Sequence, residues 1–341
     1  MSEERIASAN ARQQRPKREK RDVHGWCILD KPVGMTSTHA VSVVKRLFHA
    51  KRAGHAGTLD PLASGLLPIA LGEATKTVPF VMDGRKTYHF TVRWGEERDT
   101  DDGEGRATAN SEARPTPEQI RALLPRFTGT IEQVPPRYSA IKVDGERAYD
   151  LAREGEIVEL AARPVDIHRL DLVETPDADH SMLAAECGKG TYVRAIARDL
   201  GRALGCYGHV SALRRTGVGS FQEADAVKLA DLQAAAPAPA EGGDTGTQNL
   251  GDQRLRDQDL AALTALLQPV DAGLRSLPSL GVSRADAARL ARGQAVLLRG
   301  RDAPIMQGFV AVSTHGDLIA LAEFEQGELR PRRIFNLGTA G

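Results

Sequence analysis

The spacing of apolar residues divides the chain into short strands and amphipathic helices from about residue 24 onward. Alternating or uninterrupted apolar runs predict strands, and apolar residues spaced three and four apart predict helices. Ser37 and Thr116 stand before two helical stretches, and both are residue types that cap helix N-termini. Strands and helices mix along the chain, as in an α+β fold. The predicted strands cover residues 24–30, 66–71, 85–94, 165–173, 181–187 and 209–221, and the predicted helices cover residues 37–48, 73–82, 146–153 and 191–204, with one more beginning at Thr116.

Three segments lack such periodicity. Residues 1–23 are polar and basic, so we expect a disordered tail. Residues 234–258 are rich in Ala, Pro and Gly, which is typical of a flexible linker. A large domain at residues 24–233 lies between them, and short strands after the linker predict a compact β-rich unit at residues 277–338. Residues 96–114 are acidic and contain glycines, so we expect a surface loop there.

Residue spacing argues against metal binding and disulfide bonding. The acidic segment carries Asp99, Asp101 and Asp102, but a calcium loop needs a Glu six residues after its Gly, and that position is Ala109. The three cysteines form no C-x-x-C pair and are odd in number, which argues against a zinc site and a disulfide framework. No apolar run reaches the length of a membrane span, and no secretory segment opens the chain, so we expect a cytoplasmic protein without membrane contact.

Charge is balanced overall but clustered locally. The chain has 341 residues with 45 basic and 45 acidic side chains, so its net charge does not indicate nucleic-acid binding. Basic residues gather near both ends, which is the pattern expected of phosphate contacts, although solvated basic faces are also common. The clusters are Arg12, Arg15, Lys17, Arg18, Lys20 and Arg21 near the start, and Arg284, Arg289, Arg292, Arg299, Arg301, Arg330, Arg332 and Arg333 near the end.

The most informative segment is a Gly-containing loop in which Asp60 directly precedes Pro61. Proline fixes its own φ and biases Asp60 towards extended backbone, so the carboxylate is held on a stiff loop flanked by Arg52 and His55. Most Asp-Pro pairs simply begin a turn. From the residues alone, Asp60 is therefore either an ordinary turn residue or a reactive carboxylate.

A set of motifs in this chain resembles the TruB family of pseudouridine synthases. The loop matches G-H-x-G-x-L-D-P-x-A-x-G-x-L at residues 54–67. The resemblance extends over roughly residues 24–225, with the motifs in the family's order. The other matches are D-K-P-x-G-x-[ST]-S at residues 30–37, G-E-A-T-K at 72–76, Lys-Thr-Tyr at 86–88, K-G-T-Y-[IV]-R at 189–194 and H-V-x-x-L-R-R at 209–215.

The resemblance implies a fold and an activity. The fold is a central, mostly antiparallel mixed sheet flanked by helices and loops, with a thumb insertion at about residues 127–155 and a small C-terminal PUA-like RNA-binding domain. The activity is isomerisation of uridine to pseudouridine in the T-loop of tRNA, at position 55 of that RNA, without a cofactor. The reaction breaks the N1–C1′ bond, turns the flipped base and rejoins it through C5. The thumb implies a stand-alone enzyme that uses no guide RNA, and nothing suggests more than a monomer.

The same resemblance implies roles for three central residues. Asp60 is the expected nucleophile, which attacks C6 of the base or C1′ or assists loss of a ribose proton. Arg194 is expected to pair with it, since two charges at ~4 Å and an effective dielectric near 20 attract by about 4 kcal/mol before desolvation. Tyr88 offers an aromatic face to the flipped base and a hydroxyl near C5.

Other matched residues are expected around the target base. His55 is expected to fill the space that the base vacates when it flips, a step that costs about a few kcal/mol, or to stack on the neighbouring tertiary pair. Tyr192 is expected to be a polar contact of the pocket and Leu213 its apolar wall. The remaining expectations are Lys76 as a phosphate contact, and Lys31 with Pro32 as structural support beneath Tyr88.

Two other functions stay open on the sequence alone. One is a non-catalytic tRNA-binding or tRNA-folding chaperone that kept the fold, and the presence of Asp60, Tyr88 and Arg194 argues against it. The other is a guide-dependent rRNA pseudouridine synthase, against which the thumb segment argues.

Overall fold

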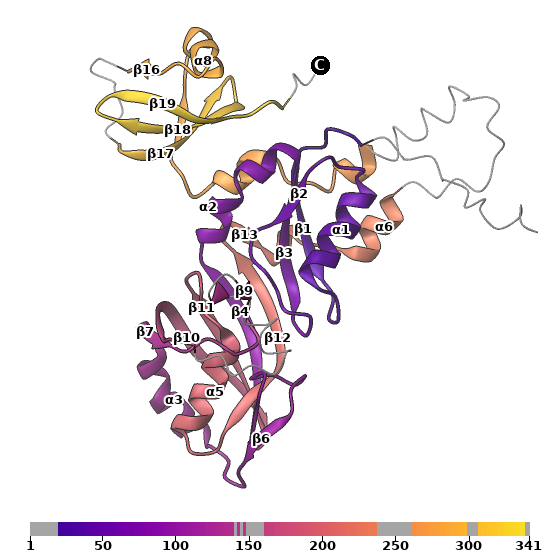
Figure 1. The fold of residues 1–341 in the computed structure, drawn as a ribbon, viewed down its shortest axis with the longest axis vertical. Coiled ribbons are helices and arrows are strands. Elements are labelled where there is room, and N and C mark those ends of the chain that lie inside the picture. Colours follow the sequence, from indigo (N-terminus) through magenta and orange to yellow (C-terminus); the bar gives the residue numbers. More distant parts are fainter. Residues whose placement is uncertain are drawn as a thin grey trace, which may run out of the picture.

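The computed structural model describes residues 20–139, 142–143, 146–147, 160–236, 261–298 and 306–337. Figure 1 shows a large, twisted sheet with helices around it and a separate small sheet formed by the last part of the chain. The large sheet has ten strands in the order β14-β1-β3-β12-β4-β11-β10-β7, with β13 paired to β12 and β2 paired to β3. Its β1–β14 and β3–β12 pairs are parallel and its other pairs are antiparallel. The prediction of a mostly antiparallel mixed sheet in an α+β fold is confirmed.

Each strand that the apolar pattern predicts in the large domain is present within a few residues of its predicted bounds. Buried apolar side chains from both halves of the sheet form a core beneath it. The strands are β1 Gly25–Lys31, β2 Ala53–His55, β3 Ser64–Leu71, β4 Lys86–Trp94, β7 Gly129–Gln133, β10 Arg163–Asp177, β11 His180–Cys187, β12 Gly208–Val218, β13 Phe221–Gln222 and β14 Val227–Lys228. The helices are α1 Ser37–Leu47, α2 Val78–Asp83, α3 Pro117–Leu123, α5 Val193–Ala203 and α6 Leu229–Ala235, with the 3-10 helices η1 Gly72–Lys76, η2 Leu124–Phe127, η3 Glu223–Asp225 and η4 Val270–Leu274.

Two helix starts show how the local sequence sets the fold. Thr116 caps α3 through a capping box, as the sequence predicts. The prediction for α1 is wrong by one residue, because Thr36 and not Ser37 is the cap. The Ser37 hydroxyl instead accepts a hydrogen bond from the Leu59 N–H and donates one to the Leu59 carbonyl, both at 2.9 Å. Ser37 thereby ties α1 to the loop that carries Asp60.

Two predicted helices are wrong in part. Residues 73–82 form two short helices, η1 and α2, because Pro79 has no N–H to donate to the preceding turn. The helix predicted from residue 146 begins as a strand, since β9 Glu146–Arg147 pairs with β8 Lys142–Val143. Residues 148–153 of that helix lie outside the described residues, as does much of the predicted thumb.

The acidic segment at residues 96–114 is not the surface loop that the sequence predicts. β5 Glu96–Arg98 and β6 Ala107–Asn110 pair as a hairpin, and the turn between them folds inward. Asp101 and Asp102 are only 5% and 3% exposed, and a backbone bridge joins Asp102 to Val210. Buried carboxylates require partners. The partners are Arg198 for Asp101 and Arg194 for Asp102, which lie 97 and 92 residues further along the chain, so the local sequence does not predict this burial.

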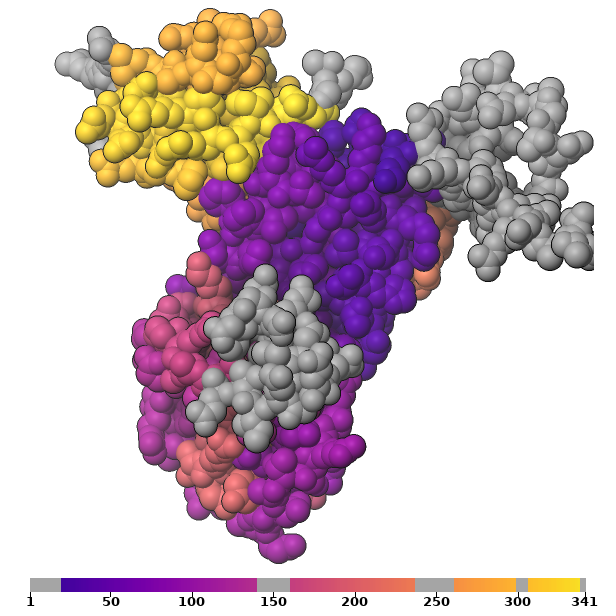
Figure 2. Space-filling model, in the orientation of Figure 1, coloured from indigo at the N-terminus to yellow at the C-terminus, as the bar shows by residue number. Residues whose placement is uncertain are grey.

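The C-terminal β-rich unit is present, with its five strands in the order β15-β17-β18-β19-β16. Figure 2 shows this unit, in yellow, resting against the N-terminal part of the large domain. Apolar residues of both parts, including Trp26 and Phe335, share one buried cluster. The elements of the unit are β15 Ser279–Gly281, α8 Arg284–Ala291, β16 Val296–Leu297, β17 Gly308–Thr314, β18 Asp317–Glu325 and β19 Glu328–Ile334.

The ends of the predicted tail and linker belong to the fold. Val23 is buried and Arg21 forms a backbone bridge to Ala50, so order begins before residue 24. Helix α6 extends into the first residues of the predicted linker. The rest of both segments, residues 1–19 and 237–258, lies outside the described residues. Within the part of the chain that the structure describes, no helix has the length and apolar character to span a membrane.

Candidate active site

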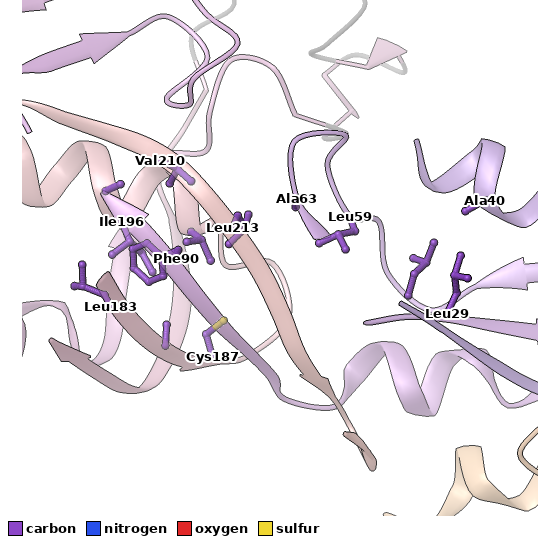
Figure 3. Packing of buried hydrophobic residues seen from close by; sticks show 14 of the residues in the cluster. Leu29, Ala40, Leu59, Ala63, Phe90, Leu183, Cys187, Ile196, Val210 and Leu213 are labelled. Atoms are coloured by element: carbon purple, nitrogen blue, oxygen red, sulfur yellow. The ribbon is translucent and has the colours of Figure 1, made fainter. Parts of the chain in front are cut away.

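The loop that carries Asp60 connects β2 to β3 and is fixed on both sides. Leu59 and Ala63 are buried, and Figure 3 shows them on the loop between Phe90 and Leu29, with all four residues in one apolar cluster. Their burial holds the backbone before and after Asp60 in place. The Asp60 side chain itself is 35% exposed, so the loop presents one carboxylate from a fixed backbone.

Lys31 supports this loop through hydrogen bonds to backbone carbonyls. Its buried ammonium group donates hydrogen bonds to the carbonyls of Pro32 at 2.9 Å, Met35 at 2.8 Å and Pro61 at 3.5 Å. Burial lowers the pKa of Lys31 to about 8, and the negative charge of Asp60 opposes that shift. These contacts join Lys31 and Pro32 to the turn beside Asp60, and their support of the pocket beneath Tyr88 stays a prediction.

Arg194 lies in the first turn of α5 and reaches Asp60. Its Nε is 3.0 Å from Asp60 Oδ2, and its side chain is only 6% exposed. Nη1 donates to Asp102 Oδ2 at 3.2 Å and to the Thr100 carbonyl at 2.9 Å, and Nη2 donates to the Tyr138 carbonyl at 3.0 Å. One guanidinium group therefore joins the Asp60 loop, the acidic turn and a residue within the predicted thumb.

A second buried arginine lies one helical turn further along α5. Arg198 Nη1 is 2.9 Å from Asp101 Oδ2, and Arg198 Nη2 donates to the Val134 carbonyl at 2.7 Å. Burial raises the pKa of Asp101 to about 6, and the charges of Arg198 and Arg194 oppose that shift. The sequence motifs assign no role to Arg198, and Asp101 is considered from the sequence only as a calcium ligand, an interpretation that the spacing rejects. The signal that points to Arg198 is its i, i+4 spacing from Arg194 on the buried face of an amphipathic helix.

Arg215, on β12, is the third buried arginine of this site, after Arg194 and Arg198. The sequence motifs assign it no role. Its guanidinium group donates to the carbonyls of Leu66 at 2.7 Å and of Thr58 and Gly57 at 3.1 Å. The close approach of β3 to β12 requires a glycine at position 65. Gly65 has φ +100°, and a Cβ there would lie 2.2 Å from the Arg215 carbonyl oxygen. Arg215 therefore holds the backbone before and after Asp60, at Gly57, Thr58 and Leu66.

Tyr88 and Leu213 lie on the neighbouring strands β4 and β12. Tyr88 is directly opposite Arg215, and Leu213 is opposite Phe90. Burial raises the pKa of the Tyr88 phenol and the Arg215 charge opposes that shift, so Tyr88 carries a neutral hydroxyl at neutral pH. Leu213 is buried and lies beside Phe90 (Figure 3). The structure thus brings Tyr88 and Leu213 next to the arginine that holds the Asp60 loop.

His55 and Tyr192 are half-buried residues at the ends of two elements. His55 is the last residue of β2, where burial lowers its pKa and the charge of Arg215 lowers it further, so it is neutral at neutral pH. Tyr192 precedes α5, and its backbone exchanges two hydrogen bonds with the Gln133 amide, at 2.9 and 3.2 Å. Burial raises the pKa of the Tyr192 phenol.

Lys76 points away from this group, towards the C-terminal unit. Its ammonium is 2.6 Å from Glu73 Oε2, donates to the Ile334 carbonyl at 2.7 Å and lies 5.9 Å from the centre of the Phe335 ring. The Asn336 N–H also donates to Glu73 at 2.8 Å. The described contacts of Lys76 therefore join the two domains, and its phosphate contact stays a prediction. Among the described residues, no group of three His, Cys, Asp or Glu side chains is arranged to hold a metal ion.

Two solved structures share this architecture. One is an H/ACA RNP bound to a substrate RNA containing 2′-deoxyuridine, with a TM-score of 0.67 at 23% identity over 92% of this chain and 85% of that chain. Another is a Cbf5-Nop10-Gar1 complex, with a TM-score of 0.66 at 23% identity over 91% of this chain and 84% of that chain. The chain therefore shares the fold of these proteins.

Sequence comparison then identifies the family. The N-terminal domain of TruB family pseudouridylate synthases matches residues 45–193, and the C-terminal domain of tRNA pseudouridylate synthase B matches residues 194–275. A tRNA pseudouridine synthase B of Nitrobacter winogradskyi is 66% identical over 322 residues, 94% of this chain and 85% of the relative. One of Brucella ovis is 55% identical over 325 residues, 95% of this chain and 99% of the relative. The chain belongs to the TruB family of pseudouridylate synthases and is an isomerase.

Proposed function

We propose that this enzyme converts a uridine in the T-loop of tRNA to pseudouridine, at position 55 of that RNA. The observation that carries the proposal is the partly exposed Asp60 carboxylate on a fixed loop, paired at 3.0 Å with the buried Arg194. Such a carboxylate can reach a bound base or sugar, while the arginine behind it keeps its direction. Relatives that are 55% and 66% identical bear the name tRNA pseudouridine synthase B, which supports tRNA as the substrate.

In the proposed reaction Asp60 is the nucleophile, acting on the base or on the sugar. The N1–C1′ bond breaks, the uracil turns in the closed pocket, and a C5–C1′ bond forms. The bond from Asp60 to the base or sugar breaks, which restores the free carboxylate. The proton on C5 leaves and N1 takes up a proton, so the product has the atoms of the substrate. An isomerisation of this kind changes no oxidation state overall and needs no redox partner.

The pocket in this proposal surrounds a flipped base. Tyr88 stacks on the base, and its neutral hydroxyl lies near C5. Leu213 provides an apolar wall, and Tyr192 provides a polar contact. Neutral His55 fills the space that the base leaves, since an uncharged imidazole can stack among bases at a lower desolvation cost than an imidazolium. Lys76 contacts a phosphate of the RNA.

We further propose that the enzyme acts in the cytoplasm as a monomer, with tRNA alone and without a guide RNA. The test incubates the purified chain with an unmodified tRNA transcript and maps pseudouridine at single-nucleotide resolution. One product in the T-loop supports the proposal. No product from the wild type would refute it in favour of a non-catalytic tRNA-binding protein, and product only after addition of a guide RNA would support the guide-dependent alternative.

A matched pair of variants assigns the carboxylate. Asp60→Asn keeps the shape of the side chain but removes its charge, and we expect no product. Asp83→Asn changes an exposed carboxylate that pairs with Lys189 on the surface, and we expect full activity. Product from Asp60→Asn would remove Asp60 from the role of nucleophile while leaving the substrate assignment intact.

A further inference from the structure

Helix α5 presents three arginines to the acidic segment at successive turns. Arg194, Arg198 and Arg202 are four residues apart, so they lie above one another on one face of the helix. Their carboxylate partners run in the opposite order along the acidic segment. The three N–O distances are 3.2 Å from Arg194 to Asp102, 2.9 Å from Arg198 to Asp101 and 2.7 Å from Arg202 to Glu97.

Arg198 differs from Arg202 in burial and in its partners. The Arg202 side chain is 54% exposed, and its described contacts are with one carboxylate, Glu97. The Arg198 side chain is 8% exposed, and it also donates two hydrogen bonds to Asp199, at 2.8 and 3.1 Å, and one to the Val134 carbonyl, at 2.7 Å. Arg198 therefore joins a side chain and a backbone carbonyl that belong to two different segments.

These two segments are the ones that Arg194 also contacts. Arg198 holds Asp101 and Val134, whereas Arg194 holds the next residue of the acidic turn, Asp102, and the carbonyl of Tyr138, four residues after Val134. A shift of either segment would move a partner of the Arg194 guanidinium group. The orientation of Arg194 towards Asp60 thus depends on contacts made one turn further along α5.

We propose that Arg198 is a positioning residue for the isomerisation, which acts with Asp101 and the Val134 carbonyl to keep Arg194 aligned on Asp60. The proposal rests on the proposed function. Arg198 touches neither Asp60 nor any reacting atom, so its effect passes through Arg194. The planar guanidinium fork is essential in this role, because the single ammonium group of Lys cannot reproduce contacts to three acceptor groups in fixed directions.

The test compares Arg198→Lys with Arg202→Lys, which makes the same change on the same face of the same helix. Single-turnover rates of pseudouridine formation are measured with enzyme in excess over a tRNA transcript, and affinity is measured by filter binding. We expect Arg198→Lys to slow the reaction on the order of tenfold with affinity within about twofold of wild type, because removing an aligning contact costs rate rather than phosphate contacts. Arg202→Lys should leave both within about twofold. A wild-type rate in Arg198→Lys would overturn the proposal.

A double-variant cycle separates positioning from a general loss of stability. In an Arg194→Lys background, where the alignment is already lost, Arg198→Lys should slow the reaction by less than about twofold more. A further tenfold loss there would show that Arg198 does not act through Arg194, and would contradict the proposal. If Arg198→Lys does not fold, Asp101→Asn replaces it, and we expect a rate several-fold below wild type, whereas an unchanged rate would overturn the proposal. Absence of product from the wild type would instead contradict the proposed function.

Discussion

Replacing Arg194 with Lys removes the guanidinium group that joins Asp60 to Asp102. Nε lies 3.0 Å from Asp60 and Nη1 lies 3.2 Å from Asp102, and at an effective dielectric near 20 each pair attracts by about 5 kcal/mol before desolvation. One ammonium group cannot take both positions, so at least one charge-assisted hydrogen bond is lost, which removes about 1.5–3 kcal/mol. Because about 1.4 kcal/mol corresponds to a tenfold change in rate, we expect a single-turnover rate on the order of 10- to 100-fold below wild type.

The assay uses a tRNA transcript labelled with tritium at C5 of uridine. The label is released when the C5–C1′ bond forms and the C5 proton leaves, so its release measures product formation directly. Affinity for the transcript should stay within about threefold of wild type, because Arg194 is buried and phosphate contacts supply much of RNA affinity. Arg202→Lys is the control for changing an arginine of α5. A rate within threefold of wild type in a folded Arg194→Lys variant would refute the argument that this guanidinium aligns Asp60.

Three further predictions concern the loop and its supports. Asp60→Ala should bind tRNA with an affinity within about threefold of wild type, since phosphate contacts dominate binding, and a near-total loss in filter binding would show otherwise. Lys31 has a pKa of about 8, so raising the pH through that value removes the ammonium that supports the Pro61 carbonyl. The rate should therefore fall above about pH 8 in wild type, and Lys31→Met, which carries no charge at any pH, should lack this step; the same step in the variant would assign it to another group. The folded pKa of Lys31 is below the ordinary lysine value of 10.5. Lys31 therefore lowers the free energy of unfolding at neutral pH, and this unfavourable contribution shrinks between about pH 8 and 10.5. Gly65→Ala should lower the free energy of unfolding by more than about 2 kcal/mol in chemical denaturation, because its Cβ meets the Arg215 carbonyl at 2.2 Å in a left-handed backbone conformation, and an unchanged midpoint would contradict that contact.

Much of the fold follows from local sequence patterns. The strands are predictable because their side chains alternate between a buried core and solvent, as the burial of β11 shows along its whole length. The capping box at Thr116 is equally local. The single helix predicted over residues 73–82 fails for an equally local reason, the missing N–H of Pro79, which the pattern of apolar residues does not register.

The site is predictable only as far as its motifs reach. The motifs predict that Asp60 and Arg194 form a pair, and their side chains form an ion pair in the structure. The burial of Asp101 and the hydrogen bonds of Arg198 were not predictable, because both depend on segments more than 60 residues apart meeting at one helix face. In an acidic, Gly-containing segment a buried carboxylate looks like a solvated one until its partner is known.

Lys76 and Arg215 show the same limit. Both are basic residues within motifs, and charge alone indicates contact with RNA phosphate for either. Lys76 contacts the C-terminal unit, through the Ile334 carbonyl and the Phe335 ring, and its phosphate contact stays a prediction. Arg215 is buried and bound to three carbonyls around the Asp60 loop. Only the three-dimensional arrangement separates arginines and lysines that hold the fold from those that face solvent.

We propose that Asp60, aligned by Arg194, isomerises one uridine in the T-loop of tRNA. The most direct test maps pseudouridine in an unmodified tRNA transcript after incubation with wild type or with Asp60→Asn, at enzyme concentrations that give saturated binding of both. We predict one pseudouridine, at position 55 of the tRNA, with wild type and none with Asp60→Asn. Pseudouridine formed by Asp60→Asn at the wild-type rate, or none formed by the wild type, would contradict the claim.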